Sequence, residues 1–416
     1  MIDRLQPPTQ IGLRPFTTST GRLVRIAVRR DSTTVGLDDA HTFSFDGSGR
    51  LIRAFWNRQS VRRSLDNRFV EKRKVGPYPW SFARRELDPV ERLGLLTTIV
   101  REIAAVRHTL RAAQLLPDPH ADDLDLRLTE ILSWTPETLE ADAERFRSVY
   151  LPVPILPPDQ YEALVVQVTE GCAYNQCAFC RFYRDRAFRV KPPAELAEHI
   201  RAVGKFFGPS LSLRRSVFLA DANALMLSAE RLAQTFDLVR RVLPFGPTGL
   251  RGIYSFIDAF SGVPKSVDHF RALADRGLRR VYLGLETGCD DLLRSLGKPG
   301  SRHDALVLVR ALRDAGIGVG IIVLLGVGGE TYQSRHVEET LAAINAMALG
   351  SQDILYLSPL AADQDAPYRR QERETGIRPL SEEEMNGQLS ALRSGLRGGP
   401  AGRVKVAVYD IRDFLY

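Results

Sequence analysis

Three of the four cysteines in this chain lie within twelve residues, in the segment TEGCAYNQCAFC (169–180). Cys172, Cys177 and Cys180 have the spacing C-x4-C-x2-C. Four cysteines in 416 residues are too few for a disulfide scaffold, and clustered intracellular cysteines more often bind metal or carry out redox chemistry. This segment is therefore the first candidate for a functional site.

Several kinds of chemistry could use three neighbouring thiols. A structural zinc site normally takes four ligands, and the next histidine along the chain, His199, falls in a helical pattern. A redox pair made of Cys177 and Cys180 would leave Cys172 unexplained, and three unrelated structural cysteines seldom share one loop. Three thiolates suit a [4Fe–4S] cluster with one iron left open for a chelating substrate or cofactor.

Alternating strand and helix patterns surround these cysteines. Apolar, β-rich runs occupy residues 163–169, 216–221, 252–258, 280–286, 318–326 and 353–359. Amphipathic helical patterns separate them at 193–207, 228–243, 266–277, 302–316 and 335–349. This alternation requires parallel pairing with right-handed crossovers, so it predicts an α/β fold, either a doubly wound sheet or a partial β/α barrel.

Polar and small residues follow these strands at the place where both architectures carry their chemistry, just past the carboxyl ends. The cysteine loop follows the first strand. The candidates after the next four strands are Asp221, Asn223, Ser255, Asp258, Glu286 and Gly326. We expect these residues to gather around the cysteines at one edge of the sheet.

The cysteine loop after the first strand of a six-unit β/α array resembles that of the radical S-adenosylmethionine (radical SAM) enzymes. VFLADANALML (217–227), YLGLETGCDDLLRSLGKP (282–299) and VLLGVGGET (323–331) also resemble segments of that superfamily. The resemblance implies a partial (β/α)6 TIM-like barrel, a [4Fe–4S] cluster held by the three cysteines, and SAM chelated to the open iron. The reduced cluster would cleave SAM to a 5′-deoxyadenosyl radical, which abstracts hydrogen from a substrate.

The resemblance also suggests roles for individual residues. Phe179 matches the aromatic residue beside the cluster and adenine, and Glu286 is expected to contact the SAM ribose or amino group. The usual spacing is C-x3-C-x2-C, so this loop is one residue longer. The usual Gly-Gly-Glu after the second strand is replaced by Ala220–Asn223. Asp221, or backbone carbonyls near it, would then contact the SAM amino group, and Asn223 is a further cofactor-binding candidate.

Other candidate residues have a second, structural interpretation. Ser255 and Asp258 could contact SAM or substrate, and Asp258 could equally cap its own loop. Gly326 would let the backbone approach adenine, although a plain turn also explains a glycine there. Cys289 could donate a hydrogen atom to a substrate radical, but a lone cysteine is more often a small buried hydrophobe.

Changes in pattern along the chain suggest four segments. They are an N-terminal mixed α+β domain (1–150), a proline-rich linker (151–161), the radical SAM core (162–360) and a short C-terminal extension (361–416). Within the first segment, residues 41–56 predict a hairpin, and helical patterns follow at 89–116 and 123–149. The last run, RVKVAVYDIRDFLY (403–416), has β character and could add an edge strand or cover an open barrel.

The sequence therefore predicts a cytoplasmic radical SAM enzyme with a small-molecule substrate and a reductase, flavodoxin or ferredoxin-type electron donor. No run of about 18 apolar residues and no apolar signal core occur, so neither a membrane span nor secretion is expected. Cobalamin is not expected, because residues 1–150 lack alternating βα units.

Two alternatives remain open. The net charge of +7 and the basic segment 53–74 are compatible with tRNA or rRNA modification. A non-catalytic iron–sulfur electron carrier or sensor would need the cluster but not SAM cleavage.

Overall fold

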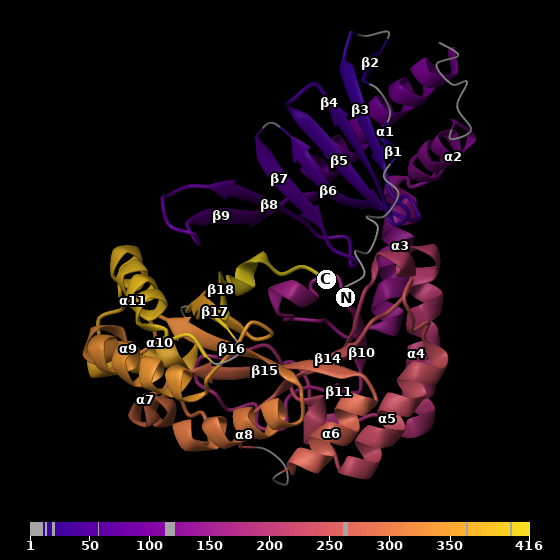
Figure 1. The fold of residues 1–416 in the computed structure, drawn as a ribbon. Coiled ribbons are helices and arrows are strands. Elements are labelled where there is room, and N and C mark those ends of the chain that lie inside the picture. The colour runs from indigo at the N-terminus through magenta and orange to yellow at the C-terminus, as the bar shows by residue number, and fades with distance from the viewer. Residues whose placement is uncertain are drawn as a thin grey trace.

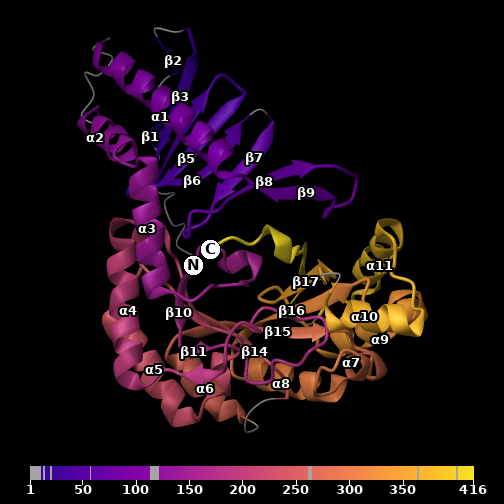
Figure 2. The same cartoon turned by 180° about the vertical axis from the view of Figure 1, so that it is seen from behind.

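The structure is a computed structural model, and it describes residues 11–12, 15–18, 21–56, 58–112, 121–260, 265–362, 365–399 and 402–416. The first ten residues, on which the expectation about secretion rested, lie outside these ranges. A nine-stranded antiparallel sheet and a seven-stranded parallel sheet dominate the molecule (Figure 1). Figures 1 and 2 show that the yellow C-terminal segment lies between the two sheets. Within the described ranges, no helix has the length and apolar character needed to cross a membrane.

The antiparallel sheet is built from the first nine strands of the chain. They are β1 (Ile11–Gly12), β2 (Phe16–Thr17), β3 (Leu23–Val28), β4 (Ser32–Leu37), β5 (His41–Asp46), β6 (Leu51–Trp56), β7 (Gln59–Arg63), β8 (Phe69–Lys74) and β9 (Phe82–Glu86). From β3 to β9, strands that are neighbours in the sequence are neighbours in the sheet. The predicted hairpin is β5–β6, and its turn closes where the Gly49 N–H donates to the Asp46 carbonyl at 3.0 Å.

Two helices cover one face of this sheet because alternate strand residues are apolar. In β4, for example, Val35 and Leu37 are fully buried, whereas Thr34 and Gly36, which precede them in turn, are not. The helices are α1 (Pro89–Ala112) and α2 (Ala121–Leu132). Their apolar stripes and the inner face of the sheet form one hydrophobic core.

The parallel sheet has the strand order β10-β13-β14-β15-β16-β17-β18. The strands are β10 (Leu164–Gln167), β13 (Val217–Ala220), β14 (Ile253–Ile257), β15 (Leu278–Glu286), β16 (Gly318–Leu325), β17 (Ile354–Pro359) and β18 (Lys405–Val408). The helices between them are α4 (Pro193–Phe207), α5 (Ala229–Val242), α6 (Val267–Asp275), α7 (Asp290–Ser295), α8 (Arg302–Asp314) and α9 (Gly329–Ala346). The α/β fold is thus confirmed, in the form of a partial TIM-like barrel.

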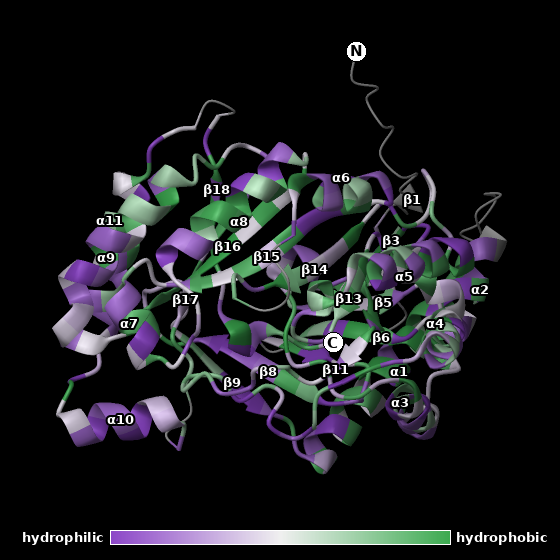
Figure 3. Ribbon diagram, turned by 90° about the horizontal axis from the view of Figure 1, so that it is seen from below, coloured by the Kyte–Doolittle hydropathy of each residue, from purple (hydrophilic) through white to green (hydrophobic). Residues whose placement is uncertain are grey.

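Sequence patterns explain why these elements begin and end where they do. Every residue of β13, β16 and β17 is buried, as expected for parallel strands covered on both faces, and Figure 3 colours much of β16 as hydrophobic. Ser228 and Ser266 cap α5 and α6 by accepting hydrogen bonds from backbone N–H groups of the first turn. After α8, Gly316 adopts a φ of 76°, which favours glycine.

The parallel sheet is open between β10 and β18, and chain segments outside the six β/α units fill that side. The Tyr416 hydroxyl accepts from the Val165 N–H at 3.0 Å and donates to the Ala163 carbonyl at 3.1 Å, which satisfies the free edge of β10. The short helix η4 (Ile411–Asp413) precedes Tyr416. It contacts the antiparallel sheet through ion pairs from Asp413 to Lys72 (2.6 Å) and Arg84 (2.7 Å).

The linker supplies a polar floor inside the barrel. It follows α3 (Pro136–Val149) and contains the short helix η1 (Pro158–Gln160). The Asp159 carboxylate accepts hydrogen bonds from Tyr282 and Tyr356, both at 2.6 Å, and forms an ion pair with Arg280 at 2.9 Å. Because β15 begins close to Arg280, this cluster lies toward the amino ends of the strands.

Several elements differ from the sequence prediction. The basic segment 53–74 includes β7 and β8, whose buried residues are Val61, Arg63, Phe69 and Glu71. The α7 helix and α10 (Pro367–Thr375) had no clear periodic signal because they are short. The α9 helix begins at Gly329, six positions before the predicted start, because Gly328 (φ of 81°) turns the chain into it. The C-terminal extension contains α11 (Glu382–Gly395), and its last run adds β18 parallel to β17.

Candidate active site

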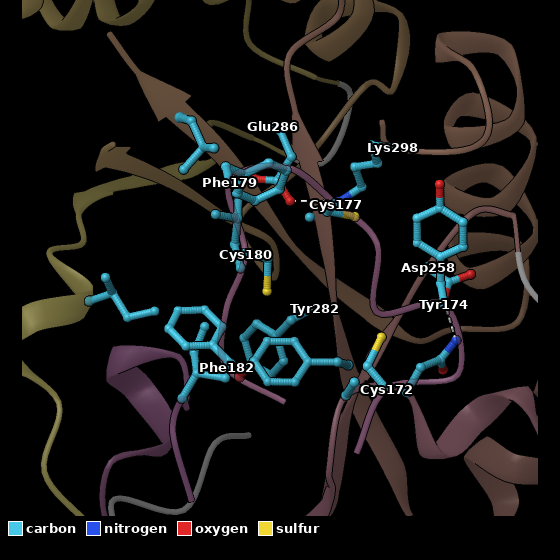
Figure 4. A pocket seen from close by; sticks show the side chains of 18 of the residues that line it. Cys172, Tyr174, Cys177, Phe179, Cys180, Phe182, Asp258, Tyr282, Glu286 and Lys298 are labelled. Carbon is cyan, nitrogen blue, oxygen red and sulfur yellow. Dashed lines mark hydrogen bonds and ion pairs between the residues drawn. The ribbon is translucent and has the colours of Figure 1, made fainter. Parts of the chain in front are cut away.

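A cavity of about 210 Å³ lies inside the barrel at the carboxyl ends of the strands. Its walls include Cys172, Cys177 and Cys180, so the three predicted cluster ligands face one space. Figure 4 shows the cysteines around this cavity, with Glu286 and Lys298 joined beside Cys177. The other predicted residues that line it are Phe179, Asn223 and Asp258.

Backbone and side-chain contacts hold the cysteine loop in place. The loop leaves the barrel through β11 (Thr169–Glu170), which pairs with β12 (Arg189–Val190) beyond the cysteines. The Arg184 guanidinium donates to the carbonyls of Cys180 (3.1 Å) and Cys177 (3.2 Å). Asn175, in the longer C-x4-C interval, has a φ of 47°, and its side chain donates to the Tyr183 carbonyl at 2.9 Å. The loop thus accommodates the additional residue by placing Asn175 in the left-handed backbone conformation, which asparagine tolerates.

The surroundings of the thiols fit an iron–sulfur cluster. Burial raises the pKa of Cys177 to about 12 and raises that of Cys180, so these thiols stay protonated until a metal displaces the protons. Among the described residues, no three His, Cys, Asp or Glu side chains gather as ligands of a single ion. A [4Fe–4S] cube instead binds each thiolate to a different iron. Three half-buried thiols around one cavity are consistent with that donor set.

Glu286 and Lys298 form the charged pair of the cavity. Their side chains are 2.6 Å apart and only 9% and 13% exposed. Burial alone would lower the pKa of Lys298, but Glu286, with smaller contributions from Cys177 and Asp258, raises it above its usual value. Gly284 leaves room for the pair, because a Cβ atom there would overlap the Glu286 carboxylate and lie 2.9 Å from the Lys298 Nζ. The strand thus presents an ion pair to the cavity where Glu286 alone was predicted.

Asn223 and Asp258 meet across the ends of β13 and β14. The Asn223 side-chain amide donates to Asp258 Oδ2 at 2.7 Å, and Asp258 Oδ1 accepts from the Phe260 N–H at 3.1 Å. Asp258 therefore both faces the cavity and caps its own loop, so the two interpretations of this residue are compatible. Phe179 lines the same cavity from between the last two cysteines.

Four predicted site residues are directed elsewhere. The Asp221 carboxylate accepts from the Gly171 N–H (3.0 Å) and the Gln167 side chain (3.1 Å). Burial raises the pKa of Asp221 to about 6. The Ser255 hydroxyl donates to the Leu219 carbonyl at 2.8 Å, because alternation in β14 places it outside the cavity.

The other two are Gly326 and Cys289. The Gly326 N–H donates to Gln388 of α11 at 2.8 Å, so its backbone approaches that helix. Cys289 is fully buried in a small apolar cluster with Leu292 and Leu324. It begins α7 and does not line the cavity, which favours the structural interpretation of this thiol.

The sequence interpretation missed several wall residues. Lys298 lies within the quoted segment 282–299, so its place in that motif was the available signal. Tyr282 lies in the same segment, two positions before Gly284, and the period of a strand places these two residues on the face that lines the cavity. Three more wall residues come from the linker and the C-terminal extension, and no sequence motif predicted them: Ile155, Tyr409 and Ile411.

Comparison with known proteins identifies the class of this domain. Residues 166–343 match the Radical SAM superfamily, and Cys172, Cys177 and Cys180 fit its cysteine loop. This part of the chain is therefore a radical SAM domain, the kind found in enzymes that use a [4Fe–4S] cluster and SAM.

Individual relatives are distant. The heme chaperone HemW of Bacillus subtilis is 24% identical over 145 residues, which are 35% of this chain and 36% of HemW. The coproporphyrinogen III oxidase HemN of Escherichia coli is 15% identical with a TM-score of 0.42, covering 56% of this chain and 51% of HemN. The radical SAM methyltransferase TsrM of Kitasatospora setae is 17% identical with a TM-score of 0.43, covering 63% and 58%. The chain thus spans about a third of HemW and about half of HemN.

Proposed function

We propose that this protein is a radical SAM enzyme that abstracts hydrogen from a small-molecule substrate. The observation that carries the proposal is that the three cysteines and the Glu286–Lys298 pair line one cavity within a radical SAM domain. When bound, a reduced [4Fe–4S] cluster supplies the electron that cleaves SAM and so starts the radical reaction.

The residues of the chain would bind and orient these groups. Cys172, Cys177 and Cys180 would each hold one iron, which leaves the fourth iron for the amino and carboxylate groups of SAM. Phe179 would pack beside adenine. Glu286, held by Lys298, would accept hydrogen bonds from the SAM ribose or amino group, and the Asn223–Asp258 pair offers a second polar contact.

The surrounding chain would exclude water, which reactive radicals require. The Tyr409 hydroxyl donates to the Leu156 carbonyl at 3.0 Å, tying the C-terminal extension to the linker on the open side of the barrel. We propose residues 162–360 as the catalytic core, with the segments 1–150, 151–161 and 361–416 as its cover. An external reductase, flavodoxin or ferredoxin would deliver the electron in the cytoplasm.

Internal contacts of the basic segment weigh against nucleic acid as the substrate. Lys72 pairs with Asp413, and the Arg62 guanidinium donates to the backbone carbonyl of the same residue at 3.2 Å. Arg63 is buried beside Asp142, and burial lowers its pKa to about 10. These three cations connect β7 and β8 to η4 and α3, so they are engaged in internal contacts rather than in a phosphate-binding surface. The relationship to HemW covers too little of either chain to transfer heme as a ligand.

The test is anaerobic purification, reconstitution with iron and sulfide, and addition of dithionite with SAM. We expect 5′-deoxyadenosine and methionine to form in equal amounts, measured by mass spectrometry, and Cys177→Ala to form neither. Cys289→Ala is the matched control and should retain the product. A stable cluster without SAM cleavage, and with an EPR signal that SAM does not change, would instead support an electron carrier or sensor.

A further inference from the structure

The cavity continues below the level at which the cysteines and Glu286 meet. Tyr282 of β15 pairs with Gly320 and Glu286 pairs with Val323, three positions further along β16, which places Tyr282 about 10 Å deeper at about 3.3 Å per residue. Sheet pairing puts Phe256 and Gly320 beside Tyr282, and Ile322 beside Gly284. Phe256, Tyr282 and Ile322 all line the cavity, so it has a deep section separate from the strand ends that would hold SAM.

The deep section is apolar although a tyrosine forms its base. The Tyr282 hydroxyl is turned away toward Asp159 at 2.6 Å, so the ring faces the cavity and the polar atom is satisfied underneath. Ile155 of the linker, with Tyr409 and Ile411 of the C-terminal extension, lines the same cavity on the open side of the barrel. The Tyr409 hydroxyl is likewise directed outward, to the Leu156 carbonyl.

The charges of the cavity also select against anions. Among the described residues that line it, the charged ones are Asp258, Glu286 and Lys298. Lys298 is the single cation of this set, and its ion pair with Glu286 neutralises it. Asp258 remains as a carboxylate held by Asn223. An anionic group in the deep section would therefore lose its hydration without gaining a counter-ion from the described wall residues.

We propose that the deep section binds an uncharged, apolar group of the substrate, either aromatic or branched aliphatic, and that Ile155 and Ile411 help to select it. This inference rests on the proposed function, because it takes the upper part of the cavity as the SAM site. It names the substrate class that the wall favours, and it assigns specificity to segments outside the β/α units.

The test compares two probes of equal size, naphthalene-2-carboxamide and naphthalene-2-carboxylate. Full-length protein carrying its cluster is saturated with SAM without a reductant, and equilibrium dialysis with chromatographic detection gives the Kd of each probe. We expect the amide to bind at least tenfold more tightly than the carboxylate. Ile411→Glu should weaken amide binding at least tenfold, and Val90→Glu on the exposed surface of α1 should leave it unchanged.

Several results would overturn the inference. These are equal affinity for the two probes, amide binding that SAM abolishes, or an Ile411→Glu protein that binds as the parent does. If Ile411→Glu fails to fold by circular dichroism, Ile155→Glu places the same charge in the same wall, from the linker. Probe binding needs no SAM cleavage, so 5′-deoxyadenosine formation by the same preparation shows separately whether the proposed function has failed.

Discussion

Replacing Lys298 by methionine tests the energetics of the charged pair in the cavity. The two charges are 2.6 Å apart, and at an effective dielectric constant of about 20 their attraction is about 6 kcal/mol. Removing each charge from water costs several kcal/mol, so the intact pair contributes little net stability. Lys298→Met deletes the attraction but leaves Glu286 buried. We expect it to lower the free energy of unfolding by about 3 kcal/mol, because cavity water partly solvates the remaining carboxylate.

The double variant Glu286→Gln/Lys298→Met removes both charges and should therefore lose only about 1 kcal/mol. Hydrogen exchange of β15 amides in increasing urea measures this free energy without requiring both sheets to unfold together. Arg271→Met is the control, because its pair with Asp268 is exposed, and it should change stability by less than about 0.5 kcal/mol. The reasoning is refuted if Lys298→Met costs no more than the control, or if the double variant loses the sum of the single losses.

Two further substitutions test the surroundings of this pair and of the first barrel strand. Gly284→Ala should lower the free energy of unfolding by about 1–3 kcal/mol, because the new Cβ displaces the Glu286 carboxylate. Gly204→Ala on α4 has open space around it and should be neutral or stabilising. Equal effects of the two substitutions in urea denaturation would contradict this. Burial lowers the pKa of His199 to about 4 from 6.5, so the unfolded chain binds more protons between these values. The neutral His199 side chain therefore contributes about 3 kcal/mol to the free energy of unfolding above pH 6.5. This contribution is lost as the pH falls toward 4. His199→Gln should flatten the dependence of unfolding free energy on pH in that window, and an unchanged slope would assign the acid sensitivity to other groups.

The barrel was predictable because its strands are short, apolar and separated by amphipathic helices with clear ends. Two of the predicted helical ranges begin at Ser228 and Ser266, which are the residues that cap α5 and α6. The antiparallel sheet was harder to predict because its outer face is polar. β7 ends in Arg62 and Arg63, and β8 ends in Lys72, Arg73 and Lys74, so local composition suggested a charged surface segment. Long-range ion pairs such as Lys72–Asp413 explain those charges. Local sequence patterns cannot predict such pairs, because the two partners are far apart in the sequence.

Within the site, strand order predicted the correct edge of the sheet but not the direction of each side chain. Ser255 and Phe256 are adjacent at the end of β14, yet only Phe256 lines the cavity, since successive strand residues point to opposite faces. Asp221 ends a strand at the right edge, but the loop folds back and uses its carboxylate to hold Gly171. Glu286, by contrast, ends β15 after a register irregularity, with a φ of 62°, and lines the cavity as predicted.

The cavity wall combines residues from the radical SAM domain with residues from segments outside it. Every cysteine of the loop, together with Glu286 and Lys298, lies within residues 166–343, the part that matches the superfamily. Ile155, Tyr409 and Ile411 lie outside it and close the open side of the barrel. If substrate choice resides in those outer segments, exchanging them should alter which probe binds while SAM cleavage persists. The apolar wall that they build, with its hydroxyl groups turned outward, is therefore the part of this protein that is most informative about its substrate.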